Sequence, residues 1–96
     1  MADVVVRNDT DRHRYEAIVD GEVAGFATYR VEGEAIVFLH TEIDDRFAGQ
    51  GIGSALARGA LDDVRRNGEL DVVPRCPFVK GWIEKHPDYQ DLVHSR

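Results

Sequence analysis

The sequence predicts an α+β fold, an α/β sandwich in which a meander of antiparallel strands precedes two helices. Before residue 48, apolar and polar residues alternate in short segments, which is typical of strands. After residue 48, the apolar residues recur with the period of a helix. A glycine-rich turn separates the two halves. The predicted order of elements is therefore β-β-β-β-α-β-α.

The first half of the chain is predicted to form four strands. Asp20-Gly21 is a dipeptide that tight hairpin turns favour, and Glu32-Gly33 marks a second turn. The last strand alternates most regularly, and we expect Phe38, His40 and Glu42 on one of its faces. The predicted strands are Val4–Arg7, Arg12–Asp20, Glu22–Arg30 and Ala35–Ile43.

The second half is predicted to form a long helix, a short strand and a second helix. The long helix begins near Ile52, where one apolar stripe starts, and ends at Asn67-Gly68, a typical helix end. Leu70–Val73 is rich in β-branched residues and is predicted to be a strand that Pro74 stops. The second helix is predicted over Pro77–Lys85, because proline suits the first turn of a helix.

Length and composition restrict the class of protein. The chain has 96 residues, 43% of them hydrophobic and 31% charged, and we expect a single domain over residues 1–96. Its apolar runs are too short to cross a bilayer and no signal peptide follows Met1, so no membrane association is predicted. The net charge of −6 argues against a nucleic-acid partner. A single cysteine excludes an internal disulfide and a cysteine-rich zinc site, and favours a cytoplasmic location.

The glycine-rich turn is the strongest functional signal in the sequence. It reads Gly49-Gln50-Gly51-Ile52-Gly53-Ser54 and lies between the longest strand and the longest helix. Alternate glycines let the backbone turn tightly and approach a ligand, and the helix N-terminus favours an anion such as a pyrophosphate. A plain turn with glycines present only for packing is the structural alternative. The turn matches neither a P-loop, which needs Gly-Lys-Ser/Thr, nor the spacing of the Rossmann motif.

This turn, followed by Ala55-Leu56, resembles the acyl-CoA pyrophosphate loop of the GNAT acetyltransferases. The chain is similar to the smallest branch of that superfamily, the minimal GNAT-like N-acetyltransferase domain proteins. The matching segments follow one another in the right order and cover most of the chain from Val37 to Val93. They are His40-Thr41-Glu42, the glycine-rich turn, Val73-Pro74-Arg75-Cys76-Pro77-Phe78-Val79 and His86-Pro87-Asp88-Tyr89.

The resemblance implies an N-acetyltransferase that moves an acetyl group from acetyl-CoA to an amine of a protein or a small molecule, without a metal. CoA would lie against the strand end with Thr41 and Ile43, and its pantetheine would enter between that strand and Leu70–Val73. Its phosphates would contact Gly49, Gln50, Gly51, Ile52, Gly53 and Ser54. The negative net charge favours a cationic acceptor. We expect a monomer or a weak dimer. A CoA-binding or protein-interaction module without turnover is the alternative.

The family loop usually reads Arg/Gln-x-x-Gly-x-Gly/Ala, and two registers are considered for this chain, of which the one set by Gly51 and Gly53 departs from the pattern at its first position. One register places Ala48 at the first position, and the other, shifted by two residues, places Arg46 there. The register with Ala48 is preferred because it puts Ile52 at the start of the helix. Backbone N–H groups would then provide most of the contacts with phosphate.

Two side chains are predicted to take part in catalysis. Cys76 is the only strong covalent nucleophile, and Arg75 with the following helix start favours its thiolate, although a lone cysteine can also be an inert core residue. His40 is predicted to be a general base or a partner of that thiolate, with a core histidine as the alternative. Glu42 is a weaker candidate, because a carboxylate at a strand end is more often solvated.

The remaining histidines and the tryptophan are not predicted to be catalytic. His86 is interpreted as a cap or packing residue, and Trp82 as part of the core. No partner is suggested for His13 or His94. The spacing of the histidines and the single cysteine predicts no metal site.

Overall fold

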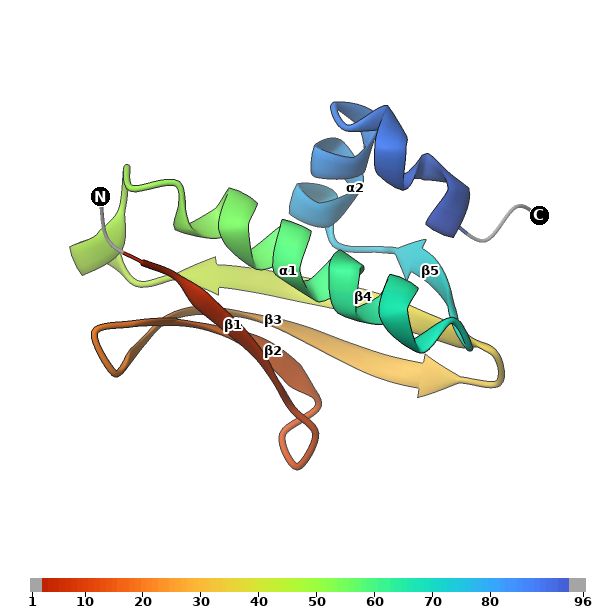
Figure 1. Ribbon diagram of the computed structural model, residues 1–96, viewed down its shortest axis with the longest axis horizontal. Helices are drawn as coiled ribbons and strands as arrows, with labels where there is room; N and C mark the ends of the chain where they lie inside the picture. The colour runs from red at the N-terminus through yellow and green to blue at the C-terminus, as the bar shows by residue number, and fades with distance from the viewer. Residues whose placement is uncertain (1–2, 94–96) are drawn as a thin grey trace.

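Residues 3–93, which the computed structural model describes, begin with strands joined by tight turns (Figure 1). These are β1 (Val5–Asp9), β2 (Arg14–Val19), β3 (Glu22–Glu32) and β4 (Ala35–Ile43). They pair in antiparallel order, as predicted. Asp20 and Gly21 both have positive φ at the β2–β3 turn, which is the conformation that the Asp-Gly dipeptide favours. β1 extends to Asp9 because its last two residues pair with β2.

The second half contains the predicted helix, strand and helix, and two short 3₁₀ helices that the sequence did not predict. They are η1 (Asp45–Phe47), α1 (Ile52–Asn67), β5 (Asp71–Pro74), α2 (Pro77–Glu84) and η2 (Pro87–Leu92). Gly68 ends α1 with φ 68°, as the Asn-Gly signal predicts. β5 pairs with β4 in parallel at one edge of the sheet. Pro74 is the last residue of β5, where the edge position tolerates a residue without an N–H.

The core lies between one face of the five-stranded sheet and the two helices. α1 contacts β1, β2, β3 and β4, whereas α2 contacts β4 and β5 and lies beside α1 (Figure 1). The apolar stripe of α1 supplies most of its buried residues, so the predicted helical face is confirmed. These buried residues are Ile52, Leu56, Ala57, Ala60, Leu61 and Val64. Within residues 3–93, no helix has the length and apolar character that a bilayer span requires.

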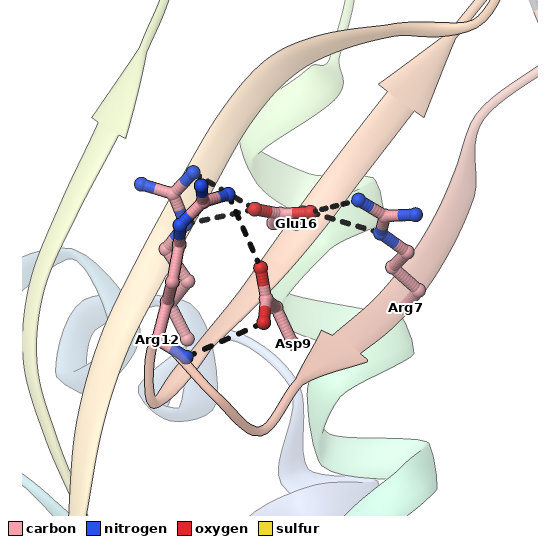
Figure 2. Close-up of polar contacts among 5 residues, drawn as sticks. Arg7, Asp9, Arg12 and Glu16 are labelled. Carbon is pink, nitrogen blue, oxygen red and sulfur yellow. Dashed lines mark hydrogen bonds and ion pairs between the residues drawn. The ribbon is translucent and has the colours of Figure 1, made fainter.

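The opposite face of the sheet, called the outer face below, carries charged side chains. Glu16 is 0% exposed there. Its carboxylate accepts from Arg7 Nε at 2.9 Å (Figure 2). It also accepts from Arg14 Nε at 2.8 Å. Two guanidinium groups therefore compensate one buried carboxylate, which is how a protein tolerates a charge without water. At the β1–β2 turn, Asp9 pairs with Arg12.

A buried tyrosine should make the stability of the folded state fall at alkaline pH. Tyr15 is 2% exposed and its hydroxyl donates to Asp63 Oδ2 at 2.7 Å. Burial first, and then the Asp63 carboxylate, raise the Tyr15 pKa far above its ordinary value of 10.0. The folded state thus holds this proton after the unfolded state has released it. Stability from this group is complete below about pH 10 and falls as the pH rises further.

We therefore expect Tyr15→Phe to be about 1 kcal/mol less stable than the wild type at pH 8, because the hydrogen bond is lost. The difference should shrink or reverse by pH 11, since the variant lacks the ionisation that destabilises the wild type. Urea unfolding of both proteins at the two pH values measures this. A difference that stays constant between pH 8 and pH 11 would contradict the assignment.

Candidate active site

β4 and β5 separate at the end of the sheet where β4 runs toward α1. Their paired residues run from Ala35 with Asp71 to Phe38 with Pro74. The Cys76 amide then donates to the Phe38 carbonyl at 2.9 Å, and this is the last backbone bond that the structure gives between the two segments. β4 continues to Ile43 beyond that bond. β4 and β5 no longer pair beyond this bond, and the resemblance would place pantetheine at this divergence, called the split below.

A one-residue bulge in β4 decides which side chains face the split. Tyr29 pairs with Phe38 and Thr28 pairs with His40, so Leu39 is an extra residue in β4. Such a bulge shifts the alternation of side chains by one position. The prediction that Phe38 and His40 share a face is therefore wrong. Phe38 is buried in the core, whereas the His40 side chain is 60% exposed on the outer face.

The same bulge turns Thr41 toward Cys76. Thr41 Oγ1 lies 3.3 Å from Cys76 Sγ, within reach of a weak hydrogen bond between the two groups. Cys76 is 3% exposed and is the N-cap residue of α2, with Pro77 in the first helical position. The sulfur therefore lies at the N-terminal end of α2. Cys76 and His40 face opposite sides of the sheet.

The glycine-rich turn forms the N-terminus of α1. Gly49 has φ 80° and Gly51, the N-cap residue, has φ 75°, so both take the left-handed conformation that glycine adopts without strain. No side chain caps the helix, and the Ala55 amide is the first to bond, to the Gly51 carbonyl at 3.1 Å. The amides of residues 52–54 precede it and are available to a ligand. This arrangement fits the pyrophosphate of CoA.

Contacts with α2 hold the first turn of α1 in place. The Trp82 indole N–H donates to Ser54 Oγ at 2.9 Å, so the Ser54 hydroxyl keeps its own proton for another acceptor. The Phe78 ring lies so close to Gly53 that a Cβ there would approach within 2.8 Å of it. Sequence reasoning missed Phe78 as part of this site. Its position in the matching Cys-Pro-Phe segment was the available signal.

Three predicted cofactor-binding residues lie in this turn or near it. Gln50 is exposed between the two left-handed glycines, and Ile43 is half-buried against the core. Ile52 begins α1, as the preferred loop register requires. Arg46, which the other register would use, is held by Asp44 Oδ2 at 3.2 Å and Glu22 Oε1 at 3.3 Å. Its hydrogen bonds also lower the pKa of Asp44.

On the outer face, His40 pairs with Glu42. His40 Nε2 lies 2.9 Å from Glu42 Oε2, and both side chains are 60% exposed. A proton on Nε2 would be donated to the carboxylate, which leaves the Nδ1 lone pair free to accept a proton. This orientation is typical of a histidine that acts as a base. The alternative of a buried core histidine is wrong for His40.

The structure also shows where the other histidines of residues 3–93 and Trp82 lie. His86 stacks on Trp82 with ring centroids 3.7 Å apart and is a packing residue, as predicted. Trp82 is 6% exposed and belongs to the core. His13 lies at the β1–β2 turn with its ring edge-on to Tyr29. His94 lies outside the described residues. Among those residues, no three metal-ligating side chains form a group that could hold an ion.

The mixed sheet, the split and the uncapped helix behind a glycine-rich turn define an α+β protein of the acetyltransferase class. The family model described as GCN5-related N-acetyl-transferase matches residues 14–92. The chain belongs to this family. The match includes the glycine-rich turn, the split and both predicted catalytic residues.

Individual relatives agree with this assignment. Protein NATD1 of Gallus gallus is 30% identical over 93 residues, which cover 95% of this chain and 84% of the chicken protein. Protein NATD1 of Mus musculus is 30% identical over 84 residues, covering 85% of this chain and 76% of the mouse protein. The NMR structure of a GCN5-like protein from Staphylococcus aureus, described as a candidate N-acetyltransferase, superposes with a TM-score of 0.71. It is 26% identical, and the match covers 100% of this chain and 93% of that one.

Proposed function

We propose that this protein transfers an acetyl group from acetyl-CoA to a primary amine. The observation that carries the proposal is that two features lie next to each other at one end of the sheet. The β4–β5 split ends at Cys76, and the uncapped N-terminus of α1 lies beside it, with Phe78 of α2 against Gly53. An anion on the helix and a chain entering the split would thus belong to one extended ligand, which is the shape of CoA.

Acetyl-CoA supplies an activated acetyl thioester. The protein has to position this thioester and remove a proton from the ammonium group of the acceptor. The acceptor nitrogen forms the new C–N bond, the C–S bond to CoA breaks, and one proton of the ammonium leaves before attack. His40, oriented by Glu42, receives that proton from an acceptor on the outer face. After the attack the nitrogen loses a second proton as the amide forms. CoA leaves as the thiol by taking up one proton, so one proton is released overall. The net charge of −6 attracts cationic acceptors to the protein.

The test of this proposal is release of CoA thiol from acetyl-CoA in the presence of a mixture of primary amines. Thiol release that needs both the protein and the amines supports transfer. Binding of CoA without amine-dependent thiol release would favour the alternative, a CoA-binding module without turnover.

Cys76 is proposed either to carry the acetyl group transiently or to align the thioester. In the first route, its sulfur attacks the acetyl carbon, the C–S bond to CoA breaks, and CoA leaves with the thiol proton. Intact-mass analysis after mixing with acetyl-CoA should then show one added acetyl group on the wild type and none on Cys76→Ala. Hydroxylamine should remove the group, because it cleaves thioesters and leaves amides.

Val79→Ala is the matched control, since it truncates another buried side chain of the helix that Cys76 caps and leaves the thiol in place. It should still accept the acetyl group on Cys76. A folded Cys76→Ala protein with wild-type turnover would remove Cys76 from the catalytic residues altogether.

A further inference from the structure

A cavity of about 250 Å³ opens near the start of β3 and the end of β4 and reaches the outer face. Three strands contribute to it, through Arg14 of β2, residues 23–26 of β3 and residues 42–43 of β4, together with Asp44. Its walls combine the Phe26 ring and the 37% exposed Val23 with the Glu42 carboxylate. Glu42 also contacts His40, so the cavity adjoins the proposed base.

The carboxylates around this cavity outnumber the cationic groups that pair with them. Glu22 and Asp44 share the single guanidinium of Arg46. Glu42 has an imidazole as its partner, and within residues 3–93 no lysine or arginine forms an ion pair with it. Arg14 also lines the cavity and shares the single Glu16 carboxylate with Arg7, so its charge offsets part of this excess. The lining residues Arg14, Glu42 and Asp44 together carry one net negative charge. A cation that enters would therefore meet carboxylate charge that the protein has not neutralised.

The Phe26 ring already accepts a cation on the outer face. Arg14 Cζ lies 4.5 Å from its centroid, which is within the range of a cation–π contact. The ring and Val23 would also cover the methylene groups of an alkyl chain. Aliphatic surface beside an uncompensated carboxylate is suited to an alkylammonium group.

Resting on the proposed function, we infer that this cavity binds a second positive charge of the acceptor, so that the preferred acceptor is an aliphatic amine with two cationic groups. The reacting nitrogen has to be neutral when it attacks near His40, so it cannot supply the charge that the cavity recognises. His40 Nε2 and Glu42 Oε2 lie 2.9 Å apart, so a cation held by Glu42 lies close to the reacting nitrogen. A short flexible alkyl linker therefore joins the two amines.

The test compares 1,4-diaminobutane with 4-aminobutan-1-ol, which present the same amine and differ in the charge of the far end. We expect kcat/KM to be roughly fivefold higher for the diamine, the upper size of one exposed ion pair, because Arg14 already occupies the Phe26 ring. Glu42→Gln should remove most of this ratio whatever its effect on the absolute rate. Glu34→Gln, which makes the same charge change at the distant β3–β4 turn, should retain it.

Binding is measured separately, by NMR titration of the protein with the diamine and with uncharged 1,4-butanediol in the absence of CoA. The diamine should shift the amides of residues 23–26 and 42–44, and the diol at equal concentration should not. Transfer to both amines with equal kcat/KM, or a ratio that Glu42→Gln leaves unchanged, overturns this inference and leaves the proposed function intact. Transfer to neither amine counts against the proposed function, and absence of diamine shifts in that case overturns the cavity assignment as well.

Discussion

Gly51→Val is expected to abolish CoA binding. Calorimetry should measure a dissociation constant for CoA with the wild type and detect no binding to the variant. Gly51 has φ 75°, a conformation that a β-branched residue adopts only with strain. The first turn of α1 would have to rearrange, and its free amides would no longer converge on one phosphate. A valine at this N-cap would also place methyl groups beside the ligand, where the open space around Gly51 now allows a phosphate to approach.

Gly33→Val separates loss of the site from general backbone strain. Gly33 has φ 59° in the β3–β4 turn and, like Gly51, has open space where a Cβ would lie. This control should lose stability to a similar degree and bind CoA as the wild type does. Equal CoA affinity in Gly51→Val and wild type would show that the phosphates do not bind at this loop.

His40→Ala is expected to lower kcat/KM by roughly 10²–10⁴-fold, the usual contribution of a general base. CoA affinity should stay unchanged, because the side chain lies on the outer face and the glycine-rich turn belongs to the helical side. Release of CoA thiol at a series of acceptor concentrations measures kcat/KM for both proteins.

His40→Gln tests whether the residue acts by proton transfer or by structure. A glutamine amide can still donate to Glu42, but it cannot take a proton from the acceptor. We expect it to be as inactive as the alanine variant. Recovery of wild-type turnover in His40→Gln would assign His40 a positioning role instead.

The sequence predicted the elements of this fold well because their signals are local. The alternation over Ala35–Ile43 gave both ends of β4, and the apolar stripe with Asn67-Gly68 gave α1. Strand ends that depend on a partner were less certain. The polar Asn8 and Asp9 extend β1 only because β2 lies beside them.

The candidate site was predicted as a set of residues but not as an arrangement. The glycine-rich turn, Thr41 and Cys76 lie where the pattern and the resemblance placed them. The β4 bulge was missed, because it depends on how β3 pairs with Leu39 and its neighbours and leaves no trace in the alternation of β4 itself. It moved His40 to the outer face and thus separated it from Cys76. The cavity beside Glu42 was missed for the same reason, since three strands build it.

Mass spectrometry of a panel of primary amines incubated with acetyl-CoA tests the central claim most directly. With the purified protein, at least one amine should gain a single acetyl group as an amide, and the reaction without protein should show none. The same reaction with Gly51→Val should also show none, because acetyl-CoA would not be held. A protein that binds CoA but acetylates no amine in the panel above the protein-free background would contradict the assignment as an acetyltransferase.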